Sequence, residues 1–147
     1  MTEKILSLDS YVFETIVIED LDHVLSITLN RPEKKNAIND VMSNEIIYAL
    51  NFAKHSDHIR VVKIQANGDV FCAGGDLKNM WSKNDETTST VPKIGDVEDI
   101  SLMIRNLNKP VVSKIQGNVL AGALMIICNS THAIASSDVT FTAPEIK

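Results

Sequence analysis

Two short stretches of the sequence place small residues where an extended segment gives way to a helical one. The first is VFCAGGDL, residues 70–77, and the second is GNVLAGALM, residues 117–125. Glycine and alanine leave the main chain accessible, and the first turn of a helix carries N–H groups without internal partners. Two N–H groups that converge on one point bind a carbonyl oxygen as it gains negative charge. The stretches therefore predict an oxyanion hole; the alternative is that their glycines serve only turns and close packing.

Other kinds of chemistry find little support in the sequence. Neither stretch matches the GxGxxG or P-loop patterns that bind nucleotide phosphates, and there is no GxSxG nucleophile motif. The four histidines are scattered without the spacing of metal ligands, so we expect no metal site. Cys72 and Cys128 lie among apolar residues without a CxxC pattern, which favours two reduced core thiols in a cytoplasmic protein.

The elements expected to position the two stretches alternate between strands and helices. Residues 11–20 and 23–32 alternate apolar and polar side chains, which predicts a β-hairpin. Asn39 and Asp96 are the expected caps of two helices with apolar residues every three or four positions. Further strands are expected at 61–68, 110–117, 132–136 and 139–143, and a buried apolar helix at 121–129. This order indicates an α/β fold.

The composition is that of one globular domain. The chain has 147 residues, of which 44% are hydrophobic and 22% charged, enough for a single core. A net charge of -5 argues against a general affinity for nucleic acid. No stretch approaches the roughly 20 apolar residues of a membrane span, and the N-terminus lacks the apolar run of a secretory signal. We divide the chain into an N-terminal tail, residues 1–11, and a core domain, residues 12–147.

Four motifs occur together in a characteristic order: LNRPEKKNAIN, VFCAGGDLKNM, NKPVVSKIQGNVLAGA and FTAPE. In this order and approximate spacing they resemble the enoyl-CoA hydratase/isomerase, or crotonase, superfamily, and the resemblance runs from about Val17 to the last residue. It implies a crotonase-like spiral of ββα units. The chain stops two residues after Glu145, where the family's C-terminal helical region would continue, so we expect that region to be absent.

The resemblance also implies roles for individual residues. Ala73 and Gly122 would donate the two N–H groups of the oxyanion hole, and Glu145, the acid of the family's PE motif, would be the catalytic base. The substrate would be an acyl-CoA thioester, with coenzyme A as part of the substrate and no separate cofactor. The residues implied to line or steady the substrate site are Lys35, Ala37, Cys72, Gly74, Asp76, Leu77 and Met125.

One position departs from the family's hydratases. Met125 lies three residues after Gly122, where two-acid hydratases carry their first glutamate. A thioether cannot transfer a proton, whereas hydration is most simply done with two carboxylates. Moving a double bond needs only one base, so the sequence favours an isomerase that uses Glu145. The alternatives are a hydratase that uses another acid, such as Glu98 or Asp99, and a non-catalytic acyl-CoA-binding paralogue or inactive fragment.

The resemblance also concerns the binding of coenzyme A and the assembly of the protein. Arg31, Lys34 and Lys35 lie in the loop that resembles the family's CoA-contacting segment, where they would meet phosphates or remain solvated. The resemblance implies a homotrimer or hexamer for the full-length form.

Overall fold

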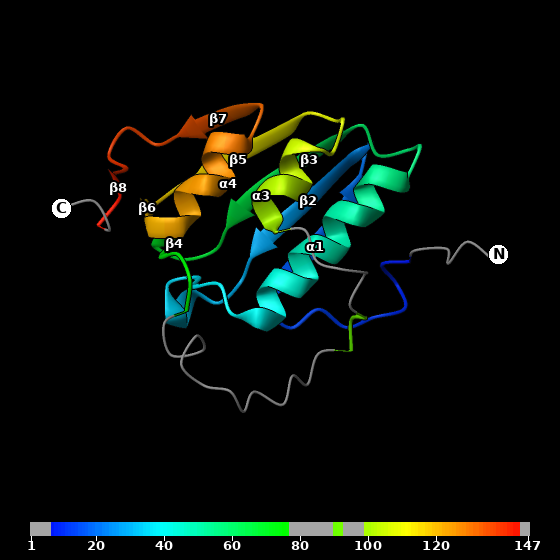
Figure 1. Ribbon diagram of the computed structural model, residues 1–147, viewed down its shortest axis with the longest axis horizontal. Coiled ribbons are helices and arrows are strands. Elements are labelled where there is room, and N and C mark those ends of the chain that lie inside the picture. The colour runs from blue at the N-terminus through cyan, green and yellow to red at the C-terminus, as the bar shows by residue number, and fades with distance from the viewer. Residues whose placement is uncertain (1–6, 77–89, 93–98, 145–147) are drawn as a thin grey trace.

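The strands form two sheets in the computed structural model, which describes residues 7–76, 90–92 and 99–144 (Figure 1). The larger sheet has the strand order β1-β2-β3-β5-β7, and the smaller has the order β4-β6-β8. The strands are β1 (Ile16–Leu21), β2 (Val24–Leu29), β3 (Val61–Ala66), β4 (Val70–Cys72), β5 (Val111–Ile115), β6 (Asn118–Leu120), β7 (His132–Ala135) and β8 (Phe141–Thr142). The helices are α1 (Asp40–His55), α3 (Ile100–Arg105) and α4 (Leu124–Asn129), with 3₁₀ turns η1 (Pro32–Lys34) and η2 (Ala121–Ala123).

The predicted β-hairpin is confirmed as β1 and β2, the antiparallel pair of the larger sheet. Its turn residues, Asp22 and His23, have φ values of 52° and 67°, the geometry that matches the twist of the flanking strands. All other strand pairs are parallel. Parallel pairs place the carboxyl ends of neighbouring strands at the same edge, and ligands of open α/β sheets bind outside those ends.

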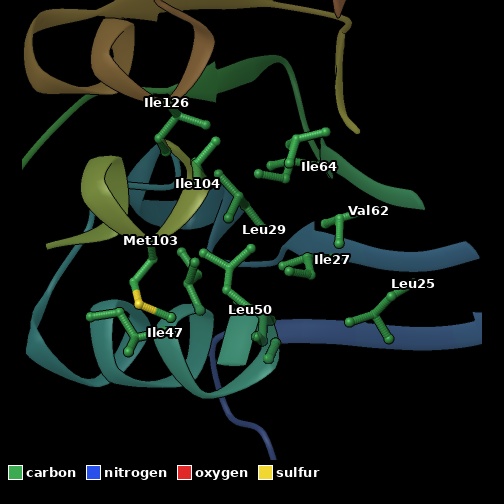
Figure 2. Close-up of a cluster of buried hydrophobic side chains, with 14 of the residues drawn as sticks. Leu25, Ile27, Leu29, Ile47, Leu50, Val62, Ile64, Met103, Ile104 and Ile126 are labelled. Atoms are coloured by element: carbon green, nitrogen blue, oxygen red, sulfur yellow. The ribbon is translucent and has the colours of Figure 1, made fainter. Parts of the chain in front are cut away.

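The helices lie on one side of the larger sheet and enclose the core (Figure 1). Asn39 caps α1 as predicted, because its side-chain oxygen accepts a hydrogen bond of 2.9 Å from the Met42 N–H. Figure 2 shows side chains of β2 and β3 facing those of all three helices. The labelled members of this cluster are Leu25, Ile27, Leu29, Ile47, Leu50, Val62, Ile64, Met103, Ile104 and Ile126, all of them buried.

Three details of the predicted elements are wrong. The cap of α3 is Asp99, whose side chain accepts a 2.8 Å hydrogen bond from the Leu102 N–H, whereas Asp96 lies outside the described residues. The segment 124–129 is not enclosed on most sides, since Ile126 is its only buried residue. Cys128 on this helix is an exposed thiol, not a core residue. Helix α4 therefore packs one face against the core and exposes another.

The predicted tail and the last strands differ in how they pack. Within residues 7–11, the Ser7 backbone exchanges hydrogen bonds of 3.3 and 3.0 Å with the Tyr48 hydroxyl, and the Tyr11 ring packs edge-on against Tyr48. The boundary at residue 11 stays a prediction. By contrast, every residue of β7 is exposed, including Ile134 at 65%. No helix in the described part of the chain is long and apolar enough to cross a lipid bilayer.

A buried carboxyl group on α1 fixes the start of β1. Glu45 has no exposed surface, and its two oxygens accept hydrogen bonds from the Thr15 N–H, the Thr15 hydroxyl and the Glu14 N–H at 3.0, 2.6 and 2.8 Å. Burial raises the pKa of Glu45, while the bonds from Thr15 and Glu14 oppose the rise. The side chain is therefore a polar anchor between α1 and the segment that enters the larger sheet.

Replacing Glu45 with glutamine is expected to lower the unfolding free energy by about 1–3 kcal/mol. The new amide group would turn its own N–H groups toward the Glu14 N–H, which removes a hydrogen bond from a partly buried donor. Urea unfolding at neutral pH measures the loss. The control is Glu19→Gln, the same change at an exposed position of β1, which is expected to alter the unfolding free energy by less than about 0.5 kcal/mol.

The same pair of proteins tests the pKa of Glu45. A raised pKa means that the folded chain holds the proton more tightly than the unfolded chain does. This contribution to stability is fully present below the ordinary pKa of 4.5 and is lost as the pH rises through the raised value. The advantage of the native chain over Glu45→Gln should therefore shrink as the pH rises from 4.5. A difference that grows with pH would contradict the assignment.

Candidate functional site

The two glycine-containing stretches meet at the carboxyl ends of β4 and β6. These strands are parallel neighbours in the smaller sheet, with Cys72 opposite Val119. Gly74 has a φ of +92°, and a methyl group on it would lie 3.0 Å from the Ala121 β-carbon and 3.2 Å from the Gly122 nitrogen. Only glycine combines this backbone angle with so close an approach. The predicted convergence of the two stretches is therefore present in the backbone.

Residues 73–76 are held against residues 35–38 by three backbone hydrogen bonds. The Ala73 N–H donates to the Lys35 carbonyl at 3.0 Å. The Ile38 N–H donates to the Gly74 carbonyl at 2.8 Å, and the Asp76 N–H donates to the Ile38 carbonyl at 2.9 Å. The prediction that Ala73 supplies an oxyanion donor is wrong for this structure, because its N–H already has a partner inside the protein.

The Gly75 N–H, two residues after Ala73, points away from residues 35–38. In a trans peptide unit the carbonyl and the N–H point in opposite directions. Because the Gly74 carbonyl faces Ile38, the Gly75 N–H faces away from the 35–38 segment. No described group accepts it, and Gly75 is exposed. The alternation of a strand places the available donor at Gly75, two positions after the one predicted.

Gly122 provides a second donor of the same kind. The Ala121 carbonyl accepts the Leu124 N–H, so the Gly122 N–H points away from α4. Within the described ranges it has no acceptor, and a methyl group added at Gly122 would meet nothing within 4 Å. Ala121 takes a left-handed φ of 53°, an uncommon angle for a residue with a β-carbon. The Gly122 N–H is therefore accessible, and its role as a donor of an oxyanion hole stays a prediction.

An ion pair ties the same two segments together. Arg31 lies 3.3 Å from Asp76, with side chains only 14% and 18% exposed, and it also donates to the Ala37 carbonyl. The expectation that Arg31 meets a substrate phosphate does not fit these contacts. Lys34 and Lys35 are exposed, and Lys35 has a left-handed φ of 52° at the end of η1.

Two buried polar side chains complete the support. Asn36 is fully buried with a φ of 54°; it accepts the Arg31 N–H and donates to the carbonyls of Asn67 and Val70 at 2.8 and 3.0 Å. The Cys72 thiol donates to the Asn36 carbonyl and accepts the Gly74 N–H. Burial raises the pKa of Cys72 to about 11, so the group stays a neutral thiol at neutral pH.

The remaining predicted residues fall into two groups. Met125 is 52% exposed, so it does not pack into the core as a filler side chain. The side chain of Asp99, the alternative acid, accepts a hydrogen bond at the start of α3 and caps that helix. Leu77, Glu98 and Glu145 lie outside the described residues, so the position of the predicted base relative to the glycines is not described.

The sequence reasoning missed two residues, Asn36 and Gly75. Asparagine is among the few residues with a side chain that tolerate a left-handed φ, and Asn36 stands in a turn. An asparagine in this turn was therefore the signal in the sequence that could have identified Asn36 as a supporting residue. No composition signal marked which amide of the AGGD run faces outward, since that depends on pairing with residues 35–38.

Comparison with known proteins gives the family. Residues 19–147 match the model of the enoyl-CoA hydratase/isomerase family, so the chain belongs to this family. It is 35% identical over 131 residues to the trans-2-decenoyl-[acyl-carrier-protein] isomerase of Streptococcus mutans, covering 88% of this chain and 50% of that protein. It is 31% identical over 128 residues to the mevalonyl-coenzyme A hydratase of Aspergillus fumigatus, covering 85% and 46%.

A solved structure confirms the crotonase-like fold. The crystal structure of an enoyl-CoA hydratase/isomerase from Mycobacterium paratuberculosis superposes with a TM-score of 0.77 at 26% identity, covering 92% of this chain and 53% of that one. The chain spans about half the length of the curated relatives it matches.

Two alanine substitutions test the geometry of the site. At Gly117 a β-carbon would lie 2.2 Å from the Asp69 carbonyl oxygen, whereas at Gly122 it would enter open space. Gly117→Ala is therefore expected to lower the unfolding free energy by about 2 kcal/mol or more. Gly122→Ala is expected to leave it unchanged or raise it by about 0.4–1 kcal/mol. Thermal and urea unfolding compare the two, and an equal loss in both would contradict the described arrangement.

Proposed function

We propose that the protein binds the acyl group of a thioester with its carbonyl oxygen between the N–H groups of Gly75 and Gly122. The observation that carries the proposal is the close approach of Gly74 to the Gly122 nitrogen, because it brings two loops together in which the exposed glycines 75 and 122 have N–H groups without an acceptor among the described residues. Membership of the enoyl-CoA hydratase/isomerase family supports a thioester as the ligand. This assignment replaces Ala73 with Gly75 and keeps Gly122.

The chemistry that suits two such donors is enolate formation. Removing a proton from C2 of a thioester moves negative charge onto the carbonyl oxygen. Two fixed N–H groups stabilise that charge more than they stabilise the neutral carbonyl, which lowers the barrier. Because the donors are backbone groups held by the fold, they need little reorganisation when the charge develops.

We propose that the reaction is migration of a double bond between positions 3 and 2, with Glu145 as the base. The carboxylate takes a proton from C2, the hole holds the enolate, and the same carboxyl group returns the proton at C4. The first catalytic glutamate of two-acid hydratases is replaced here by Met125, whose partly exposed thioether is suited to contact an acyl chain. One base is sufficient for this reaction.

Hydration is the second candidate. The names of the two relatives include both an isomerase and a hydratase, so the family alone does not choose between them. Asp99 is disfavoured as the second acid because it caps α3. The relatives' names also give both acyl-carrier protein and coenzyme A as carriers, and we propose coenzyme A here. For the full-length protein we retain the homotrimer or hexamer and the cytoplasm as proposals.

The test is Glu145→Gln assayed with 3-enoyl-CoA in single-turnover conditions. Loss of the general base is expected to slow the appearance of the conjugated 2-enoyl thioester, followed by ultraviolet absorbance, by about 10²–10⁴-fold. The amide is close in size to the carboxyl group, so substrate affinity should change little. Glu19→Gln is the matched control because it makes the same change at an exposed position of β1, and it should retain the rate.

Three other outcomes would overturn the isomerase. An undiminished rate in Glu145→Gln would exclude Glu145 as the base. Conversion of 2-enoyl-CoA to the 3-hydroxy product, faster than any double-bond migration, would favour the hydratase. Binding of both thioesters without turnover of either would favour a non-catalytic acyl-CoA-binding protein.

A further inference from the structure

We propose that Arg31 is a positioning residue that sets the direction of the Gly75 N–H, and that it is not a ligand of the substrate's phosphates. The inference rests on the proposed function, because it concerns how one of the two thioester-binding donors is held.

The contacts of Arg31 lie on both sides of the backbone bridge that carries Gly75. One guanidinium nitrogen donates to the Ala37 carbonyl, next to Ile38, whose backbone pairs with Gly74 and Asp76. Both terminal nitrogens reach the same Asp76 oxygen, at 3.4 and 3.3 Å. Arg31 therefore binds residues 35–38 through a main-chain oxygen and residues 73–76 through a carboxylate.

The chemistry of the guanidinium suits this task. It is planar, always charged and offers donors in a fixed fork, so it can bind a carbonyl and a carboxylate at once. A lysine ammonium is a compact point charge that does not reproduce both directions. With 14% of its side chain exposed, Arg31 has little surface left for a phosphate, whereas the neighbouring Lys34 is exposed.

Control of the Gly75 direction should matter more for catalysis than for binding of the nucleotide part. The hydrogen bond to the developing oxyanion depends on distance and angle, and a misplacement of about 1 Å costs about 10²-fold in rate. The adenine and phosphate groups of coenzyme A do not depend on this N–H. Loss of Arg31 is therefore expected to lower kcat and to leave the affinity for free coenzyme A unchanged.

The experiment uses the full chain and cinnamoyl-CoA, a conjugated thioester whose absorbance moves to longer wavelength when its carbonyl is polarised. Arg31→Lys, Asp76→Asn and the double variant are compared with the native chain for this red shift, for kcat with 3-enoyl-CoA, and for the affinity of free coenzyme A. Asp76→Asn nearly preserves shape and the Arg31–Ala37 contact, so it covers the case in which Arg31→Lys fails to fold.

Each single variant is expected to lose most of the red shift and about 10-fold in kcat, with the affinity for free coenzyme A within about 2-fold of the native chain. The double variant should resemble the singles, because residues of one contact are not additive. Lys34→Gln, in the same loop, is expected to keep the red shift. Hydrogen exchange of the Ile38 and Asp76 amides, whose hydrogen bonds form the backbone bridge beside Gly75, should rise in Arg31→Lys even without ligand.

Two results distinguish a failure of the inference about Arg31 from a failure of the proposed function. If the native chain shows a red shift and the Arg31 variant keeps it while losing affinity for free coenzyme A, then Arg31 is a phosphate ligand and the inference fails. If the native chain binds cinnamoyl-CoA without any shift, or does not bind it, then the proposed function itself fails. Unchanged exchange of the Ile38 and Asp76 amides in Arg31→Lys would count against the positioning role in either case.

Discussion

The hydrogen bond from the Ile38 N–H to the Gly74 carbonyl is the constraint on which the rest of the site depends. Because the peptide unit is planar and trans, fixing that carbonyl also fixes the N–H of Gly75 on the opposite side. The bonds at Lys35 and Asp76 on either side prevent the unit from rotating. A single pairing between two loops, 35–38 and 73–76, thus decides which amide of the AGGD run faces outward.

The second donor follows from strand pairing in the smaller sheet. β4 and β6 are parallel, so both chains leave the sheet at the same edge, and Gly74 packs against Ala121 and Gly122. A β-carbon at Gly74 would lie only 3.0–3.2 Å from atoms of the other loop and would also have to adopt a φ of +92°. The close approach of the two backbones therefore has a steric requirement for glycine that is separate from any chemical role.

Polar groups around the site are used mainly for support. Asn36 has all of its side-chain hydrogen-bonding groups paired, the Cys72 thiol is held neutral by burial, and Arg31 is paired with Asp76. Buried polar groups that are fully paired specify one arrangement of a loop instead of several. The fold does not by itself choose between the proposed isomerase and a hydratase, because that choice depends on the acids placed near the proposed oxyanion hole.

The sequence by itself determined the family, the β-hairpin, the cap at Asn39 and the two stretches that meet. These are local: alternation, capping and glycine-rich turns depend on residues a few positions apart. The sequence did not predict the exposure of Cys128 or the helix cap at Asp99, because both depend on how the elements pack. The tertiary structure alone decided that Ala73 is engaged, that Gly75 is available and that Arg31 faces Asp76. Hydrogen bonds across some 36–45 positions of sequence set these directions, and no local pattern encodes which partner a given N–H will find.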